Sequence, residues 1–398
     1  MATLRPFRAL RPSPADAAII AAVPYDVVNT DEARALANDN PLSFLRVSRA
    51  ELELPAGTDP YSTPVYERAV VNFARLRQRM TVEAEPSLYF YRLRMGPHEQ
   101  TGLAGCWALD EYDHDVIKKH EKTRRDKEDD RTRHMIALKA QTGPVFLTYR
   151  AADDINTIAT RVMTAPPLID FQAADHVQHA LWKVTNVDCA SLVTAFGRIG
   201  RLYIADGHHR AASAARARDE LRGAGDSSTF LAVAFPHDQV QILSYNRVVK
   251  TLEPLTADQF ERAVRATFDV SDGPKAPVRR GEISMYFGGK WWTLRSRAAS
   301  GTDAIRSLDV SVLQEQLLAP ILGITDITTD KRIDFVGGAR GTGELERIVD
   351  TGAAKVAFSM FPVSVADLMA VSDAGAIMPP KSTWFEPKLR DGLLIHLI

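Results

Sequence analysis

Apolar residues along the chain follow two patterns, one typical of strands and one typical of helices. Short runs rich in aromatic and aliphatic residues, bounded by Gly or Pro, predict strands at residues 88–93, 102–109 and 145–149. Apolar residues at helical spacing among good helix formers predict helices at residues 66–80 and 211–221. The alternation of these patterns predicts a mixed α/β (α+β) fold.

The pattern changes after residue 250. A helix start at Thr256 is followed by a Gly/Pro-rich link at residues 271–281 and by a strand-like run at residues 283–294. A chain of 398 residues is also longer than a single core usually grows. We therefore expect two regions, a catalytic region at residues 1–250 and a mixed α/β domain at residues 251–398.

Composition and charge exclude several classes of protein. The chain is 45% hydrophobic and 25% charged, which is typical of an ordered globular protein. A formal net charge of -1 provides no general field for nucleic acid, which we do not expect as a partner. Cys106 and Cys189 form no metal or disulfide pattern, and no apolar run is long enough for a signal peptide or a membrane span. These features predict a cytoplasmic protein.

One pentapeptide combines an anion-binding position with titratable groups. Residues 202–205 read as a strand and residues from Ala211 onward as a helix, so Asp206-Gly207-His208-His209-Arg210 occupies a strand-to-helix turn. The first turn of a helix favours an anion such as phosphate, and Gly207 allows the close approach of a ligand. Arg210 adds donors that match phosphate oxygens, while His208 and His209 can move protons near neutral pH.

Two other interpretations of this turn stay open. Asp206 could be only a helix cap, with the histidines filling space. Asp and His are also good ligands for zinc, iron or manganese, with further ligands drawn from His120, His134, His176 or His179. A metal-dependent hydrolase is therefore the alternative to phosphate chemistry.

A mixed-charge segment at residues 118–134 precedes the turn. Such a segment is typical of a solvated helix with pairs such as Glu121 and Arg125. A helix over this range would also place several cationic groups on one side. These are His120, Arg124, Lys127, Arg131 and His134. If that side faces the turn, its cations could neutralise phosphates, and Glu121 or Asp126 could act as a base or a magnesium ligand.

Several separated motifs, in order, resemble the DUF1015 family. The resemblance runs almost from end to end. The motifs are PYDV at 24–27, NPLSFLRV at 40–47, KHEKT at 119–123, DR at 130–131, YIADGHHRAA at 203–212 and MPPKSTWFEPKL at 378–389.

The DGHHR turn is also similar to the turn in free-serine kinases of the ParB/sulfiredoxin-like superfamily. The resemblance implies a ParB/sulfiredoxin-like core with additional N-terminal and C-terminal α/β elements. It places Asp206, His208 and His209 at the active site and assigns nucleotide phosphates to Gly207 and Arg210, with His208 and His209 beside them. Glu121 has no counterpart by motif, and we assign it the role of base from its chemistry. We expect further contacts to the nucleotide from Lys119, His120, Thr123, Arg124 and Arg131.

The sequence therefore predicts a kinase-like phosphotransferase. It would move a phosphoryl group from ATP or ADP, with Mg²⁺, to a small hydroxyl substrate, with free L-serine as a candidate. Besides the metal-dependent hydrolase, a nucleotide-binding regulatory module without turnover is the alternative. The oligomeric state expected on general grounds is a homodimer.

Overall fold

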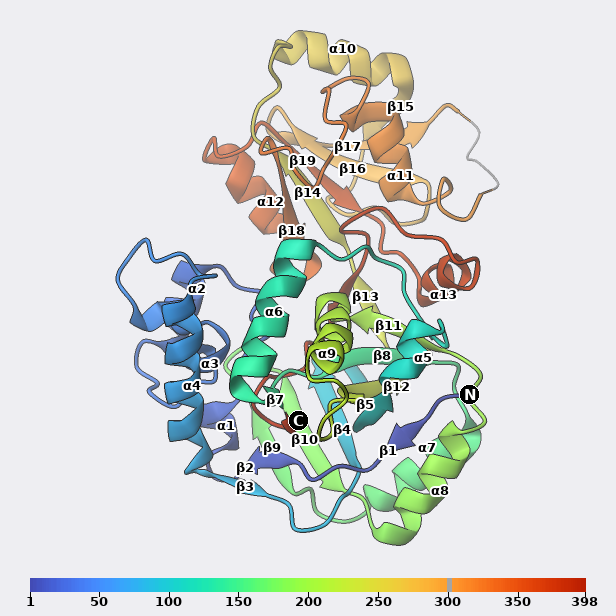
Figure 1. Ribbon diagram of the computed structural model, residues 1–398. Coiled ribbons are helices and arrows are strands. Elements are labelled where there is room, and N and C mark those ends of the chain that lie inside the picture. The colour runs from blue at the N-terminus through green and yellow to red at the C-terminus, as the bar shows by residue number, and fades with distance from the viewer. Residues whose placement is uncertain (299–302) are drawn as a thin grey trace. The chain divides into compact units, whose positions relative to one another are not determined.

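The computed structural model describes residues 1–298 and 303–398, and the chain forms two compact units (Figure 1). The first unit consists of Met1–Lys119, Thr123–Val240 and Pro387–Ile398. The second unit consists of His120–Lys122 and Gln241–Glu386. The chain thus leaves the first unit after Val240 and returns to it at Pro387. As a statement about domains, the division predicted at residue 250 stays a prediction.

The first unit is centred on one large mixed sheet. Among the described residues nine strands form this sheet, in the order β6-β11-β8-β12-β5-β4-β10-β9, with β1 paired to β5. β11 runs parallel to β6 and antiparallel to β8, while β8 runs parallel to β12. The strands are β1 Leu4–Arg5, β4 Tyr89–Met95, β5 His98–Ala108, β6 Ile117–Lys118, β8 Val145–Tyr149, β9 Ile169–Gln172, β10 Gln178–Lys183, β11 Leu202–Asp206 and β12 Thr229–Pro236.

Two short pairs of strands complete the first unit. They are β2 Leu10–Pro12 with β3 Met80–Val82, and β7 Ala140–Gln141 with β21 His396–Leu397. The last pair joins the C-terminal strand to residues that lie more than half the chain away in sequence. The C-terminal segment is therefore part of the first unit and can contribute side chains to it.

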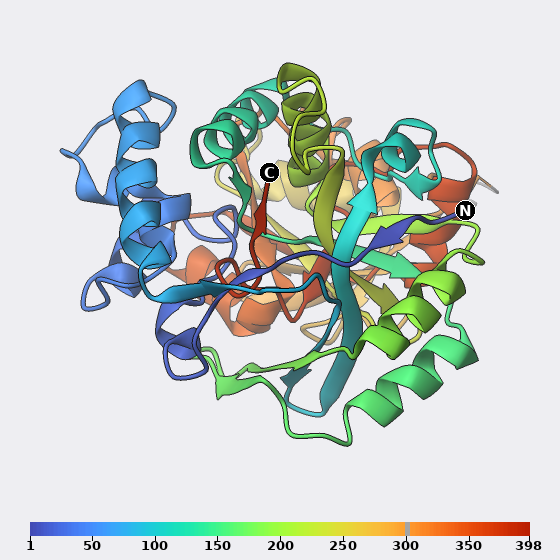
Figure 2. The ribbon, with the colours of Figure 1, turned by 60° about the horizontal axis from the view of Figure 1, so that its bottom comes forward.

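Helices cover the sheet of the first unit. α6 and α9 lie side by side, as do α7 and α8 (Figures 1 and 2). The helices are α1 Ala17–Ile20, α2 Thr30–Ala37, α3 Leu45–Ser48, η1 Ala50–Glu53, α4 Thr63–Arg77, α5 Leu109–Asp113, α6 Arg125–Leu138, α7 Asp153–Val162, α8 Asn186–Phe196 and α9 His208–Glu220.

Two central strands of this sheet, β8 and β12, are buried on both faces and mostly apolar. Every residue of β8 and of β12 is buried, as expected where a sheet has packing on both sides. Against the sheet, Phe196 of α8 lies edge-on to Trp107 and Tyr149, with ring centroids 5.1 and 5.0 Å apart. This aromatic cluster joins α8 to β5 and to β8, and β8 is a neighbour of β11 in the sheet.

The second unit is built on an antiparallel sheet. In its described part six strands follow the order β15-β17-β16-β19-β14-β18, and β13 pairs with β20. Its strands are β13 Gln241–Leu243, β14 Tyr245–Val249, β15 Phe268–Asp272, β16 Glu282–Phe287, β17 Lys290–Ser296, β18 Ile333–Gly337, β19 Val356–Met360 and β20 Trp384–Glu386. Its helices are α10 Ala257–Thr267, α11 Asp309–Leu313, the π-helical η2 Gln314–Leu318, the 3₁₀-helical η3 Gly338–Arg340, α12 Gly341–Asp350 and α13 Val365–Asp373.

The structure confirms the mixed α/β class and corrects some boundaries. The strand predicted at residues 145–149 is β8, and the helix predicted at 211–221 is the larger part of α9. The single strand-like run predicted at 283–294 is wrong, because the chain reverses at Gly288 and Gly289 to form a hairpin of β16 and β17. Both glycines have positive φ, 62° and 78°, which a two-residue turn between right-twisted strands requires.

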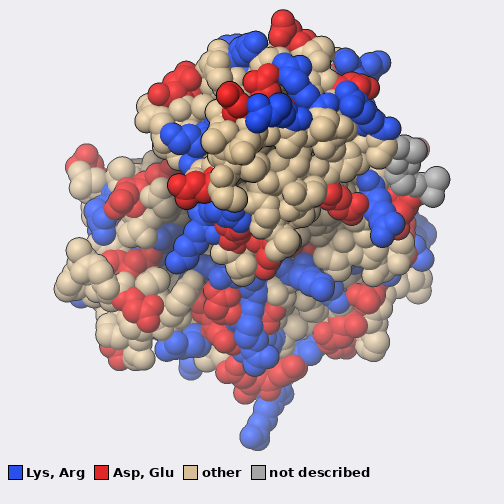
Figure 3. Space-filling model, turned by 90° about the horizontal axis from the view of Figure 1, so that it is seen from above, with Lys and Arg blue, Asp and Glu red and all other residues tan. Residues whose placement is uncertain are grey.

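The surface carries both signs of charge. On the face that Figure 3 shows, Lys and Arg side chains are interspersed with Asp and Glu, around a stretch of uncharged residues. The described residues of this face therefore form no extended surface of one sign, which long-range attraction of a polyanion would need. Within the described part of the chain, no helix is both long and apolar enough to cross a membrane.

Candidate active site

The turn predicted to carry the chemistry connects β11 to α9. Gly207 stands between them with φ of 94°, a left-handed conformation that glycine adopts without strain. A Cβ at this position would also lie 3.0 Å from Nε of Arg210. Both the backbone angle and the space therefore require glycine. As predicted, the turn directs the N-terminal end of a regular helix toward the end of a buried strand.

Asp206 ends β11 within a small network of charges. Its Oδ1 accepts from the backbone N–H of Gly207 at 2.9 Å, and its Oδ2 lies 3.2 Å from Nζ of Lys388 and 3.6 Å from Nη2 of Arg210. Burial favours the neutral acid, but Lys388 and Arg210 outweigh it and hold the pKa of Asp206 well below its usual range. Asp206 is therefore ionised at neutral pH and stabilises the turn by fixing two cations.

Arg210 directs its guanidinium into the first unit. The residue is 9% exposed, and its Nη1 donates to the carbonyl oxygen of Pro144 on the loop before β8. Together with its ion pair to Asp206, this contact places the side chain beneath the turn. Sequence reasoning had assigned Arg210 to nucleotide phosphates, and that role stays a prediction. The geometry adds a structural role. The guanidinium stabilises the turn through its contacts with Asp206 and with the carbonyl oxygen of Pro144.

The two histidines of the turn differ in exposure. His208 is buried, whereas His209 is half-buried and its Nε2 accepts a hydrogen bond of 3.1 Å from the backbone N–H of Arg124. A ring nitrogen that accepts a hydrogen bond carries no proton, so in this arrangement Nε2 of His209 is an acceptor. The contact connects the turn to the start of α6 and fixes the orientation of the His209 ring.

The helix predicted over residues 118–134 begins later than expected. Lys118 belongs to β6, whose Ile117 and Lys118 pair with β11, and α6 starts at Arg125. The predicted row of cations on one helix face is therefore wrong, because His120 and Arg124 precede the helix. Backbone pairing to β11 takes the first part of the segment, and the acidic Asp126 and Glu128 in the first turn of α6 favour a helix start there.

Most cations of this segment have acidic or aromatic partners. Lys119 donates to the carbonyl oxygen of Tyr112 at 2.7 Å and to Asp115 at 2.8 Å, and Arg124 pairs with Asp126 at 2.7 Å. Thr123, a further predicted contact to the nucleotide, donates its hydroxyl to Glu128.

Arg131 has a different environment from these residues. Its guanidinium pairs with Asp130 at 2.7 Å and lies 4.1 Å from the ring centroid of Tyr25. Of the predicted contacts in the first unit, the structure therefore brings Arg124 to the turn through its backbone and places Arg131 near Arg210, while Lys119 is held by Tyr112 and Asp115.

His120 and Glu121 belong to the second unit. His120 is buried, its Nε2 lies 3.3 Å from the hydroxyl of Thr383, and its carbonyl oxygen accepts from the N–H of Met378 at 2.8 Å. Glu121 is half-buried. The roles of His120 toward nucleotide and of Glu121 as a base stay predictions.

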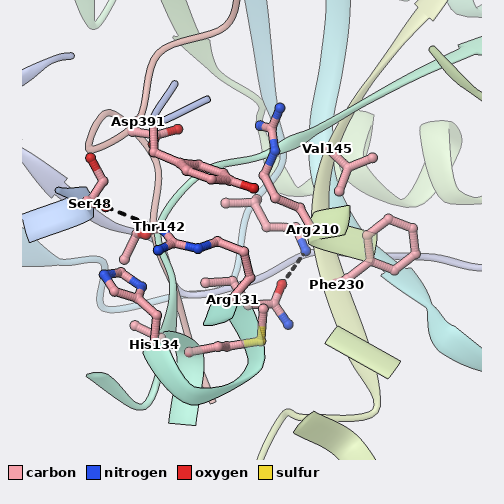
Figure 4. Close-up of a pocket in the computed structure, with 14 residues that line it drawn as sticks. Ser48, Arg131, His134, Thr142, Val145, Arg210, Phe230 and Asp391 are labelled. Atoms are coloured by element: carbon pink, nitrogen blue, oxygen red, sulfur yellow. Dashed lines mark hydrogen bonds between the residues drawn. The ribbon is translucent and has the colours of Figure 1, made fainter. Parts of the chain in front are cut away.

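A cavity of about 40 Å³ lies within the first unit, and of the five residues of the turn its lining includes Arg210 (Figure 4). Its polar lining combines Arg210 of α9 and Arg131 of α6 with Asp391 of the C-terminal segment. The other residues that line it are Tyr25, Ser48, His134, Met135, Ala140, Gln141, Thr142, Gly143, Val145, Phe230 and Leu231. The two cations and the acid come from segments that are far apart in sequence.

Asp391 is a buried acid of this cavity. It is 3% exposed, and burial raises its pKa to about 7, an effect that Asp26 reinforces and the nearby Arg210 and Arg131 reduce. Burial and the charge of Asp26 together outweigh the attraction of the two guanidinium groups. Near neutral pH, both the protonated and the ionised form of Asp391 are therefore populated.

Sequence reasoning missed Lys388 and Asp391 as site residues. Lys388 lies in the motif MPPKSTWFEPKL and Asp391 follows it, but neither has a local pattern that marks it as functional. Tyr25 lies in the motif PYDV, which served only for the family resemblance. The sequence did contain a signal for these residues. PYDV precedes the DGHHR turn and MPPKSTWFEPKL follows it, and both belong to the same ordered set of family motifs as the turn. Their convergence depends on pairing of the C-terminal segment with the first unit.

The histidines considered as metal ligands make contacts of their own. His134 directs Nε2 to the carbonyl oxygen of Val47 at 3.0 Å, and burial lowers its pKa to about 4. His179 lies 2.8 Å from the hydroxyl of Tyr91 and 3.1 Å from Nε of Arg390. These rings already satisfy hydrogen bonds of buried groups, so the first unit gives a metal-dependent hydrolase no support from them.

The fold and the site define a mixed α/β protein with a charged strand-to-helix turn and a polar cavity. The family model described as "Protein of unknown function (DUF1015)" matches residues 4–311. The chain belongs to this family, as its motifs predicted. A comparison with curated proteins found no match.

Solved structures give distant similarities. A C-terminally truncated SbnI from Staphylococcus aureus is 14% identical, covering 74% of this chain and 87% of its own, with a TM-score of 0.41. A free serine kinase in complex with AMP is 15% identical, covering 72% of this chain and 90% of its own, with a TM-score of 0.38. A conserved hypothetical protein from Pyrococcus furiosus is 16% identical, covering 73% and 94%, with a TM-score of 0.37. At such scores the function has to be argued from this chain's own residues.

Proposed function

We propose that this protein is a nucleotide-dependent phosphotransferase. It moves a phosphoryl group from ATP or ADP to the hydroxyl of a small substrate, with free L-serine as a candidate, and it uses Mg²⁺. The observation that supports the proposal is the β11–α9 turn, in which Gly207 adopts a left-handed backbone between a buried strand and the first turn of a regular helix. A helix N-terminus beside a glycine turn suits an anion such as a phosphate chain.

The charges around the turn suit phosphoryl transfer. Asp206 stays ionised through Lys388 and Arg210, so the turn is held in one arrangement before any ligand arrives. The backbone N–H of Arg124 orients His209, and the half-buried imidazole of His209 belongs to the first turn of α9. Preorganised donors and charges of this kind account for most of the catalysis in phosphoryl transfer.

The donor chemistry also fits magnesium. Mg²⁺ usually takes one or two carboxylates together with phosphate oxygens and water. Asp206 is ionised and its side chain is 27% exposed, so it can contribute an oxygen without first losing a proton. When bound, the ion would supply neutralisation of charge on the phosphates.

In the proposed reaction, the acceptor oxygen forms a bond to the transferred phosphorus while the bond from phosphorus to the leaving nucleotide oxygen breaks. The hydroxyl proton passes to Glu121, the carboxylate that the sequence assigns as base. Gly207, His208, His209 and Arg210 bind the phosphates or hold the turn that binds them. Lys119, His120, Thr123, Arg124 and Arg131 remain predicted contacts to the nucleotide.

The test separates binding from turnover. Calorimetry with ATP, ADP and CTP, each with Mg²⁺, measures nucleotide affinity, and ³¹P NMR with L-serine measures phosphoserine. In Glu121→Gln we expect nucleotide affinity to survive and turnover to fall by about 10² to 10⁴, because the swap keeps size but removes the proton acceptor. The exposed Glu67→Gln is the matched control and should retain full turnover.

The outcomes distinguish the alternatives. Full turnover in Glu121→Gln would show that Glu121 is not the base. Nucleotide binding without turnover of any hydroxyl substrate would identify a regulatory module instead. Absence of nucleotide binding, together with a stoichiometric transition metal found by elemental analysis, would favour the metal-dependent hydrolase.

A further inference from the structure

Two buried polar atoms on residues that line the cavity of the first unit have no hydrogen-bond partner among the described residues. They are Nε of Arg210, which is a donor, and Oδ1 of Asp391, which is an acceptor. The residues are 9% and 3% exposed. Buried polar groups are nearly always paired, since a buried group without a partner loses the hydrogen bonds that it would make to water. Two such atoms at one cavity, of opposite hydrogen-bonding character, indicate a ligand that both accepts and donates.

The charged residues that line the cavity indicate which group of the ligand accepts hydrogen bonds. Arg131 and Arg210 contribute guanidinium groups, which match the two oxygens of a carboxylate (Figure 4). Burial keeps the phenol of Tyr25 neutral by raising its pKa, so Tyr25 adds a hydroxyl donor rather than a negative charge. The accepting group of the ligand is therefore an oxyanion of small size.

Asp391 indicates which group of the ligand donates a hydrogen bond. Its carboxyl is the acid of the lining, and Gly143 leaves room for Oδ1, because a Cβ at residue 143 would overlap that oxygen. A hydroxyl or an ammonium group next to the oxyanion would satisfy Oδ1. Since one water needs about 10–15 Å³ by the same measure, about 40 Å³ holds roughly three waters or a small head group.

We propose that this cavity binds the head group of a small carboxylate that carries an α-hydroxyl or α-amino group. The carboxylate oxygens accept from Arg210 Nε and from Arg131, and the α-substituent donates to Asp391. The inference rests on the proposed function, whose small substrate it assigns to a chemical class, because Arg210 belongs both to the turn and to the cavity. Direct binding without nucleotide tests it separately from phosphoryl transfer.

The experiment is a calorimetric titration of the full chain at pH 8, where the ionised form of Asp391 prevails. The probes are glycolate, glycine, acetate and ethanolamine. Glycolate or glycine, or both, should bind at least about tenfold more tightly than acetate, which lacks the α-donor, and than ethanolamine, which lacks the carboxylate. Whichever of the two binds identifies the α-substituent.

Variants connect that selectivity to the cavity. Asp391→Asn keeps the shape but removes the charge, so glycine should lose about tenfold or more in affinity and lose more than glycolate does. The matched control is Asp238→Asn, an exposed acid of the same unit, which should leave all affinities unchanged. Equal binding of acetate and glycolate, or binding of none of the four probes, would overturn the proposal and leave ordered water as the occupant. Nucleotide binding that persists in that case would leave the proposed function standing.

Discussion

Each unit of the molecule contains a strand that ends in a glycine turn and leads to a helix, and the two turns are built differently. In the second unit, β18 ends at Gly337, and Gly338 follows before α12. A Cβ at Gly337 would lie 2.6 Å from the ring of Trp384, and one at Gly338 would lie 2.7 Å from the carbonyl oxygen of Ser244. These glycines are needed because neighbouring groups pack against the backbone.

In the first unit, the glycine of the β11–α9 turn stands among buried charges. Asp206, Arg210 and Lys388 surround Gly207, whereas the ion pair on α12, between Glu344 and Arg347, has an arginine that is 62% exposed. The contrast teaches that a glycine turn between a strand and a helix does not by itself indicate a binding site. Convergence of buried charges at the turn is the feature that distinguishes the β11–α9 turn from the turn in the second unit.

The largest expected effect is on the buried network. Asp206→Asn leaves Arg210 and Lys388 as buried cations without a carboxylate, and we expect a loss of about 3–5 kcal/mol in the free energy of unfolding at pH 7. Because the folded pKa of Asp206 is lowered, its contribution is present above the unfolded pKa and is lost as pH falls through the folded value. Urea unfolding with hydrogen exchange of the α9 amides measures the loss.

The exposed pair on α12 provides the control for this comparison. Glu344→Gln should leave the exchange of α12 amides nearly unchanged, because solvent screens the charge of the exposed Arg347. If Asp206→Asn proved as mild as Glu344→Gln, the charges under the β11–α9 turn would have no special role in holding it.

Each unit also has a buried acid with a raised pKa. Burial raises the pKa of Asp391 to about 7 and that of Asp309 to about 6. Since both folded values exceed the unfolded value of about 3.9, the native state binds more protons, and stability falls as pH rises from about 4 to the folded pKa.

Replacing either acid by Asn should remove the pH dependence that this acid gives to the free energy of unfolding. Asp391→Asn should remove a fall in stability between about pH 4 and 7, at most about 4 kcal/mol, and Asp309→Asn a smaller fall that ends near pH 6. Urea midpoints at half-unit pH steps, as differences from the wild type, measure both. Identical profiles for Asp391→Asn and the wild type would mean that Asp391 does not change its protonation on unfolding.

The smallest expected effect is that of replacing glycines by alanine. Two such substitutions separate the cost of the backbone angle from the cost of the contact between the added Cβ and Arg210. Gly207→Ala places a Cβ at φ of 94° and 3.0 Å from Arg210 Nε, and it should cost about 1–3 kcal/mol. Gly281→Ala in the second unit has φ of 85° and nothing within 4 Å of the added Cβ, so the strain of the angle alone should cost about 1 kcal/mol. Urea unfolding of both variants gives the comparison, and equal losses would show that the Arg210 contact contributes nothing.

The sequence by itself determined the local elements that carry the site. The apolar runs of β8 and β11 and the alanine-rich α9 follow from residue spacing, and Asp206-Gly207 between them predicts the turn. The family also follows from its motifs in order. These are short-range properties, because hydrophobic periodicity and glycine conformation depend on neighbouring residues.

Tertiary structure alone decided how the turn is supported and which residues line the cavity. Lys388 and Asp391 enter the first unit only because the C-terminal segment pairs with strands formed much earlier in the chain. The same holds for the charged segment before α6, where pairing of β6 with β11 replaced the helix that local spacing favoured. Burial and partner charges then set the inward direction of Arg210 and the raised pKa of Asp391. No local sequence pattern encodes either property, because both depend on which distant segments exclude water from these side chains.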